Sequence, residues 1–371
     1  MLRFPAAPAM AGALLLACVL PPALAAAQTV PAGIAAFMVM TVCTDATDTI
    51  LPGVAPVDAA CKTKRKIRAG ETPPYSLTDF SAVTGPCADQ QGIVARINVP
   101  VLQGTTQRTV SFDSHVPRSD CVLSGDGTLY GASVEGSDGV FGFIMGDAGP
   151  TGLVSYDSPP QCRALPHDTA RFDRGWVIGP ALLPAAGVPG YTAFRAVLTT
   201  GDPAAALQAP CPKGGPLALT AWVLDDMAFT AGVTLPALVS DHYSRADLAG
   251  TGPGTAQQME RTYWTAEFGL TRWEKWARVD WAGGTAPVPT LARAAQTAGT
   301  CSAPHDMPAA PAMQTGPLET AGSWSQVVRD TDSGSQHRWM LVQCHDYTNI
   351  DRTPPSGIPA IPAAYAGWWN G

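Results

Sequence analysis

The sequence predicts an all-β protein of the antiparallel sandwich or jelly-roll type, and two observations lead to that prediction. Glycine and proline together make up 72 of the 371 residues, 37 Gly and 35 Pro, and they are spread along the whole chain. Short runs rich in Val, Thr, Tyr and Trp, which favour strands, lie between them. Glycine and proline at this frequency are typical of many short strands joined by turns rather than of long helices.

The first 27 residues have the features of a secretory signal peptide. Arg3 precedes an apolar run over Ala9–Leu20, and small residues follow it. A second interpretation is a lipoprotein signal in which Cys18 becomes the lipidated first residue. No later stretch approaches the ~20 consecutive apolar residues that a membrane-spanning helix needs. We therefore expect a secreted or periplasmic protein with no membrane span.

The cysteines predict a fold tied by disulfide bonds. Their even number after the signal segment, in an exported chain, predicts four disulfides, and we take the pairing of neighbours in order as our prediction among the many that are possible. Their wide spacing lacks the close pairs of zinc sites, so we expect no metal and no cofactor. The eight cysteines are Cys43, Cys61, Cys87, Cys121, Cys162, Cys211, Cys301 and Cys344.

The charge balance argues against a nucleic-acid partner. The formal net charge of −7 becomes −8 when Arg3 leaves with the signal peptide. One local exception is the segment 62–68, which holds five positive charges. Such a segment contacts an acidic polymer or an anionic lipid in some proteins, but a solvated loop is its commoner explanation.

The chain has one candidate boundary between regions. Proline and glycine dominate residues 208–216, and nine of the ten tryptophans follow them. We therefore predict an N-terminal β region over 28–210 and a Trp-rich C-terminal β region over 211–371. The alternative is one continuous domain in which residues 208–216 connect two sheets, and a disulfide at Cys211 would favour it.

The strands are expected where β-prone residues lie between turn signals. A second hairpin is predicted from 324–329 and 337–343 around a turn at 330–334, and 290–298 is the one short helix that we expect. The other clear strands are 93–101, 108–113, 140–145, 216–224 and 235–239.

The most informative stretch is 258–281, which reads as a β-hairpin and holds four of the ten tryptophans. Two runs rich in Thr, Tyr, Trp and Val flank a turn that ends at Gly269, where a tight turn needs positive φ. With that turn, Arg261 lies opposite Glu274 and Glu260 lies opposite Lys275. Both are pairs of opposite charge, so each supports the same register.

The two faces of this hairpin differ in character. One carries Thr262, Trp264 and Trp273, which suit a core. The other combines aromatic planes with guanidinium groups, which suit stacking on sugar rings and hydrogen bonding to their hydroxyl or carboxylate groups. We predict that this second face binds a glycan through Arg261, Tyr263, Arg272, Glu274 and Trp276. The alternative is a solvated face of salt bridges and cation–π contacts.

No nucleophile elbow, phosphate-binding loop or zinc-protease helix occurs in the sequence. We therefore predict an exported protein that interacts with an acidic or neutral polysaccharide. The alternatives are a non-catalytic structural or adhesion protein of the envelope, and a module that binds a protein partner.

A glycan-cleaving enzyme is the catalytic form of the same prediction. Its candidate catalytic residues are Glu274, Asp241 and His242. A glycosidase needs two carboxyl groups facing one cleft, and Glu260 and Glu274 fail this test because they point to opposite faces. A lyase would use Arg261 or Arg272 to neutralise a uronate. Convergence of the three candidates in one cleft would favour catalysis.

Overall fold

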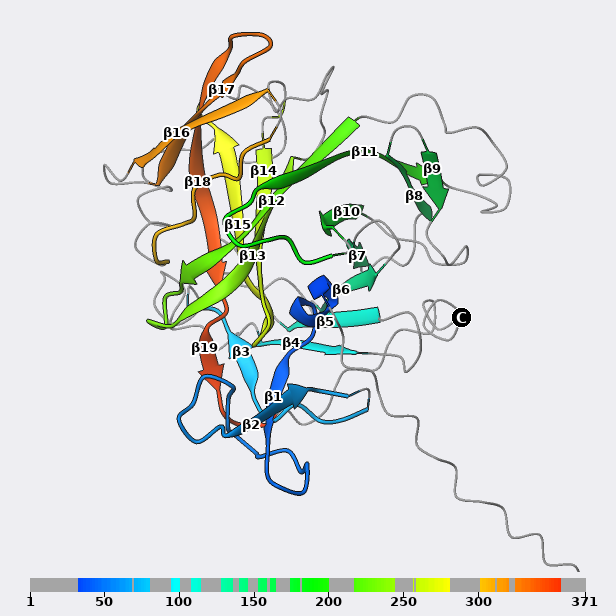
Figure 1. Ribbon diagram of the computed structural model, residues 1–371, viewed down its shortest axis with the longest axis vertical. Helices are drawn as coiled ribbons and strands as arrows, with labels where there is room; N and C mark the ends of the chain where they lie inside the picture. The colour runs from blue at the N-terminus through cyan, green and yellow to red at the C-terminus, as the bar shows by residue number, and fades with distance from the viewer. Residues whose placement is uncertain are drawn as a thin grey trace, which may run out of the picture.

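The structure is a computed structural model, and its described part is nearly all strand (Figure 1). The prediction of an all-β fold is confirmed. The structure describes residues 33–68, 70–80, 95–100, 108–114, 128–135, 140–145, 153–158, 161–164, 174–180, 182–199, 217–243, 256, 258–280, 301–310, 312–319 and 324–354.

A ten-stranded antiparallel sheet that curls into a half-barrel dominates the fold (Figure 1). In spatial order its strands are β16 (Met313–Glu319), β17 (Ser325–Asp330), β18 (Gln336–Asp346), β15 (Gly269–Arg278), β14 (Gln258–Thr265), β13 (Thr234–Tyr243), β12 (Leu217–Ala228), β11 (Gly190–Thr199), β8 (Leu153–Ser158) and β9 (Gln161–Ala164).

Two smaller sheets complete the described structure. A 3-10 helix, η1 (Gly33–Phe37), precedes a two-stranded sheet of β1 (Thr41–Thr44) and β2 (Thr63–Lys66). The seven-stranded sheet contains, in spatial order, β10 (Arg174–Gly179), β7 (Val140–Met145), β6 (Thr128–Glu135), β5 (Arg108–Ser114), β4 (Ala95–Pro100), β3 (Ser76–Thr78) and β19 (Asn349–Asp351).

Strands from either side of residue 211 share both larger sheets. In the ten-stranded sheet β11 pairs with β12, and in the seven-stranded sheet β19 pairs with β3. The seven-stranded sheet therefore takes one edge strand from near the C-terminal end of the described chain.

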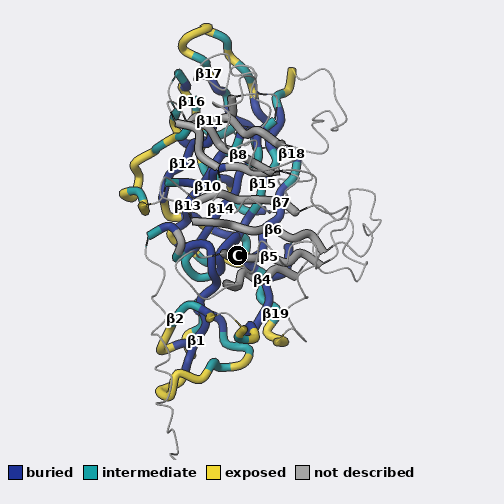
Figure 2. Tube along the Cα trace, turned by 90° about the vertical axis from the view of Figure 1, so that its right-hand side faces the viewer, coloured by how far each residue is buried: buried dark blue, intermediate teal, exposed yellow. Residues whose placement is uncertain are grey.

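The main hydrophobic core lies between η1, β10 and the large sheet. Ile34, Ile178 and Leu238 are fully buried there, and Trp222 and Trp264 pack in the same cluster. Figure 2 shows the buried residues in the middle of the molecule and exposed residues at its two ends, in the loops beside β1 and β2 and at the tip beside β17. The core therefore covers one face of the large sheet near its centre.

The hairpin of β14 and β15, predicted at 258–281, has the expected register over its charged part. Arg261 lies opposite Glu274 and Glu260 lies opposite Lys275 in the ladder, as expected. Near the turn a bulge shifts the pairing, so that Trp264 lies opposite Leu270. The φ of Gly269 is 81°, in the left-handed region that the turn was predicted to need.

The second hairpin and the clear strands are also confirmed. β17 and β18 pair antiparallel with Val328 opposite His337, and the turn holds Gly334 at a φ of 72°. The predicted strands at 93–101, 108–113, 140–145, 216–224 and 235–239 correspond to β4, β5, β7, β12 and β13. The helix expected at 290–298 lies outside the described residues.

Two disulfide bonds join neighbouring cysteines, as predicted: Cys43–Cys61 and Cys301–Cys344. The other four cysteines of that prediction, Cys87, Cys121, Cys162 and Cys211, lie outside the residues whose side chains are described, as does the signal segment with Cys18. Within the described part of the chain no helix is long and apolar enough to cross a membrane.

The basic segment 62–68 uses most of its charge within the fold. Arg65 forms ion pairs with Asp48 and Glu71, and Arg68 contacts the same two carboxylates. Lys66 turns inward and donates to the backbone oxygens of Val39 and Ala266. Burial lowers the pKa of Lys66 to about 8. Ion pairing and burial therefore take up three of the five positive charges, which favours a structural role for the segment.

Candidate functional site

The hairpin of β14 and β15 presents two different surfaces, because successive residues of a strand point to opposite faces. We call the face toward η1 and β10 the inner face. Residues 301–310, which we call the strap, cross the opposite face, and we call that the strap face. The disulfide Cys301–Cys344 ties the first residue of the strap to β18.

A network of five charged side chains fills the strap face. Cross-strand pairing places Asp241, Arg261 and Glu274 in one row over β13, β14 and β15. Arg272 and Asp346 are paired in the next row, on β15 and β18. All five residues have 0% exposure, so the network is entirely interior.

The ion pairs of this network are close and mostly formed through guanidinium groups. Arg261 Nε lies 2.5 Å from Asp241 Oδ1 and Arg261 Nη2 lies 2.9 Å from Asp241 Oδ2, a bidentate pair. Arg272 Nη2 lies 2.6 Å from Glu274 Oε1 and its Nη1 lies 3.9 Å from Asp346 Oδ2. Burial by itself lowers the pKa of Arg261, but the charge of Asp241 raises it well above its ordinary value. The arginines therefore stay cationic in the interior.

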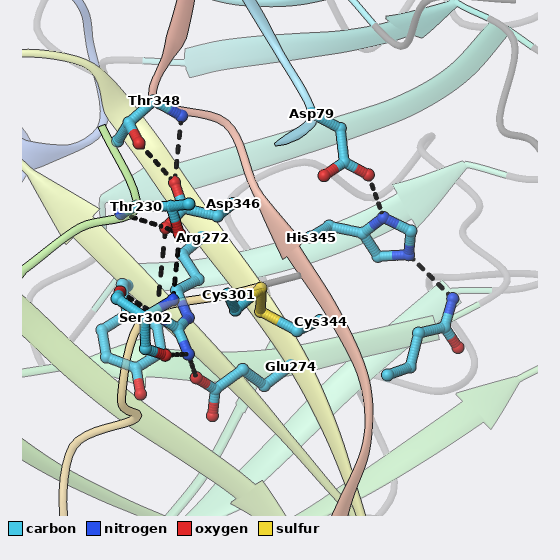
Figure 3. Close-up of a disulfide and its surroundings, with 12 residues drawn as sticks. Asp79, Thr230, Arg272, Glu274, Cys301, Ser302, Cys344, His345, Asp346 and Thr348 are labelled. Carbon is cyan, nitrogen blue, oxygen red and sulfur yellow. Dashed lines mark hydrogen bonds and ion pairs between the residues drawn. A yellow bond between two sulfur atoms is a disulfide. The ribbon is translucent and has the colours of Figure 1, made fainter. Parts of the chain in front are cut away.

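The strap supplies the remaining acceptors. Arg272 donates from Nη1 to the Ser302 hydroxyl at 2.9 Å and from Nη2 to the Ser302 carbonyl at 3.0 Å (Figure 3). Arg261 donates to the carbonyl of His305, and the His305 backbone N–H donates to the Tyr263 hydroxyl at 3.1 Å. The strap thus covers the network and accepts several of its hydrogen bonds, whereas Arg272 Nε is buried without a hydrogen-bond partner among the described residues.

The predicted glycan-binding face is therefore not an exposed surface. The sequence shows matched charges and aromatic rings there but not the strap that covers them. Trp276 donates to Glu274 Oε2 at 2.7 Å, and guanidinium groups lie 5.1 Å and 5.2 Å from the ring centroids of Trp276 and Tyr263. The five residues at 0% exposure are Arg261, Tyr263, Arg272, Glu274 and Trp276.

The three candidate catalytic residues do not converge in one cleft. Asp241 and Glu274 point to the strap face, where arginines pair with both, whereas His242 is the next residue of β13 and points to the inner face. Burial raises the pKa of Asp241, and the neighbouring Arg261 opposes this rise. The arrangement of Asp241 and Glu274 is that of a structural network rather than of an acid and a base facing a substrate.

The inner face of the same strands carries a second polar arrangement, which we call the polar band. It consists of two adjacent rows of side chains that run across β12, β13, β14, β15 and β18, each residue directly opposite the next. The first row is Thr220, His242, Glu260, Lys275 and Gln343, and the second is Trp222, Ser240, Thr262, Trp273 and His345.

Several groups of the polar band have no partner. Glu260 and Lys275 are half-buried and lie opposite each other, yet within the described structure neither side chain makes a hydrogen bond or an ion pair. The Thr220 and Ser240 hydroxyls are buried without a hydrogen-bond partner. Buried polar groups in folded proteins are usually satisfied, so these hydroxyls are exceptions, as is Arg272 Nε on the strap face.

The polar band ends at a histidine that is held from both ring nitrogens. His345 Nδ1 bonds to Asp79, which follows β3, and its Nε2 lies 2.7 Å from the side-chain amide nitrogen of Gln343. Its ring lies against Trp273 with centroids 5.4 Å apart and stacks on Tyr347 at 6.2 Å. Figure 3 shows this pair on one side of β18 and the Arg272 network on the other.

Reasoning from the sequence missed the polar band. It used Glu260 and Lys275 only to fix the register, and it placed Trp273 in the core, against which that side chain does pack. The alternation of the strand could have indicated it. Residues two positions apart lie on the same face of a strand, and Glu260, Thr262 and Trp264 follow one another on the inner face, so that face is partly polar. His345 and Asp79 are 266 residues apart, and no local pattern links them.

In the described ranges, no group of three or more His, Cys, Asp or Glu side chains is placed to hold a metal ion. No protein-family model, no curated protein and no solved structure matches this chain.

Proposed function

We propose that the protein is an exported protein that binds polysaccharide through the polar band of its inner face. The two disulfide bonds are compatible with a secreted or periplasmic protein. The observation that carries the proposal is the opposed pair Glu260 and Lys275, half-buried and unpaired beside the ring of Trp273.

The chemistry of these groups suits a sugar polymer. A half-buried charge without a partner has lost part of its hydration and gains when a ligand supplies a hydrogen bond. Sugar hydroxyls both donate and accept, so one chain of sugar residues satisfies a carboxylate, an ammonium group and hydroxyls together. The indole of Trp273 packs against the main core but is only partly buried, and we propose that its remaining exposed part supplies an apolar plane for a sugar ring.

The test is a binding screen of the mature protein on acidic and neutral polysaccharides, by affinity electrophoresis in gels that contain each polymer. We expect retention by at least one polymer, and at least tenfold weaker binding for Trp273→Ala and for Lys275→Ala. Tyr191→Ala is the matched control, because Tyr191 is 48% exposed and lies outside the polar band.

Each variant must keep the melting temperature of the unchanged protein for its binding to be interpreted. Retention by none of the polymers would contradict the proposal, and so would unchanged binding by folded Trp273→Ala. In the first case the remaining interpretation is a structural or partner-binding protein.

A further inference from the structure

The described part of the molecule offers one group that is built as a base and that no structural role fully accounts for. His345 Nδ1 bonds to the carboxylate of Asp79, which is fully buried. A carboxylate only accepts hydrogen bonds, so Nδ1 carries the proton, and in the neutral ring Nε2 presents its lone pair to the inner face. The Gln343 amide, 2.7 Å away, donates to that lone pair.

The surroundings of His345 fix its ring, which is buried at 8% exposure, and Nε2 contacts the side chain of Gln343. Trp273 and Tyr347 hold the two faces of the ring. Gln343 is half-buried, so its side chain is the one contact of Nε2 that a ligand can replace without unfolding the strand. His345 thus has the arrangement of a general base: a carboxylate accepts from one ring nitrogen, and the donor at the other nitrogen is replaceable.

A cation lies next to this base. Lys275 is directly opposite Gln343, two residues before His345 on β18, so Lys275 and His345 are diagonal neighbours on the inner face. Such neighbours lie about 7–8 Å apart, a span that one sugar residue can bridge. Because Lys275 has no ion-pair partner among the described residues, its charge is available to a carboxylate of the ligand.

We infer that His345, Lys275 and Trp273 form a site for β-elimination in polysaccharides that contain uronate. The inference rests on the proposed function, because the polymer must first bind to the polar band. Trp273 stacks on the sugar, Lys275 pairs with its carboxylate and stabilises the negative charge that develops there, and His345 Nε2 faces the proton on C5.

The reaction balances without an oxidant, a reductant or an added cofactor. His345 Nε2 takes the C5 proton, and the electron pair of the C5–H bond forms the C4=C5 double bond. The C4–O4 bond breaks and leaves its electron pair on O4. The imidazolium of His345 then returns the proton to O4, which restores the neutral base and releases a chain with an unsaturated uronate end.

The experiment incubates the mature protein with polygalacturonate, with alginate and with amylose, a neutral control, and follows the ultraviolet absorbance of unsaturated uronate together with reducing ends. We expect unsaturated ends from at least one acidic polymer and none from amylose. His345→Gln should lower the rate at least about a hundredfold, the usual contribution of a general base, while binding is retained. His337→Ala, in the same strand but paired with Asp280, is the matched control.

Asp79→Asn tests the positioning of the ring, since an amide can also donate to Nδ1 and so favour the wrong tautomer. We expect a lower rate and an altered pH profile while KM stays the same. Binding without unsaturated ends, or reducing ends without unsaturation, would overturn the elimination inference and leave the binding proposal intact. Retention by no polymer would overturn both. A His345→Gln protein that binds and reacts at the unchanged rate would remove His345 from the reaction.

Discussion

The two faces of one hairpin use the same kinds of residue in opposite ways. On the strap face the five charges of the network are buried and lie in ion pairs, and the strap adds further acceptors. On the inner face the side chains of Glu260 and Lys275 are half-buried, without a partner in the described structure. The comparison teaches that a charged and aromatic strand face does not by itself indicate a binding surface.

The energetic reason is the cost of removing charges from water. A buried ion pair offsets that cost only when the geometry is close and the remaining donors are satisfied. Arg261 meets this condition through a bidentate pair with Asp241 and a further bond to the strap. Where such matching is absent, burial stays incomplete, as it does at Lys275.

The largest effect is expected when one partner of the buried network is removed. Arg261→Met leaves the Asp241 carboxylate in the interior without its counter-ion, and we expect a loss of about 3–5 kcal/mol in the free energy of unfolding. Urea denaturation measures it. Arg68→Met is the control, because the Arg68 side chain is 42% exposed and its surface pairs contribute at most about 1 kcal/mol. Equal losses in the two variants would contradict the distinction.

A smaller effect is expected from His242 as the pH falls. Burial lowers the pKa of His242 from 6.5 to about 4. Below pH 6.5 the unfolded chain takes up a proton at this ring while the folded protein does not, so stability is full above that pH and falls toward pH 4.

Because the His242 ring remains partly exposed, solvent moderates this loss, and we expect about 1–2 kcal/mol. Urea midpoints between pH 7 and pH 4 measure it, and His242→Gln should flatten the curve in this window. If the slope persists in His242→Gln, other groups cause the loss.

The smallest effect on stability is expected in the polar band. Glu260→Gln and Lys275→Met remove charges that have no described partner, so each should change the free energy of unfolding by no more than about 0.5 kcal/mol. Thermal and urea unfolding of both variants provide the check. A loss above about 2 kcal/mol for either one would mean that the two charges do contribute to the fold, and it would weaken the contrast between the faces.

The sequence predicted the register of the hairpin because two independent charge pairs, Arg261 with Glu274 and Glu260 with Lys275, agree on it. It did not predict which face is covered. The strap begins at residue 301, more than twenty residues after β15 ends at Arg278, and its position depends on a disulfide to β18. Local patterns describe alternation within a strand, whereas burial depends on what the rest of the chain lays over it.

His345 shows even more clearly that local sequence patterns do not predict contacts between distant segments. A pattern of alternating residues places His345 on the inner face of β18, but its partner Asp79 comes from the end of β3 in the other sheet. The two meet only through the packing of the sheets, so the sequence offered no spacing that would identify the pair.

The pairing of β19 with β3 also sets an order of events for the newly made chain. The ribosome delivers β3 long before β19, because their paired residues Leu77 and Ile350 are 273 positions apart. Until the last strand arrives, the outer side of β3 offers unpaired backbone groups to any other extended chain, which is how edge strands start aggregation. Truncation just before residue 349 would make that temporary exposure permanent, and a chaperone that shields extended segments would matter most in this interval.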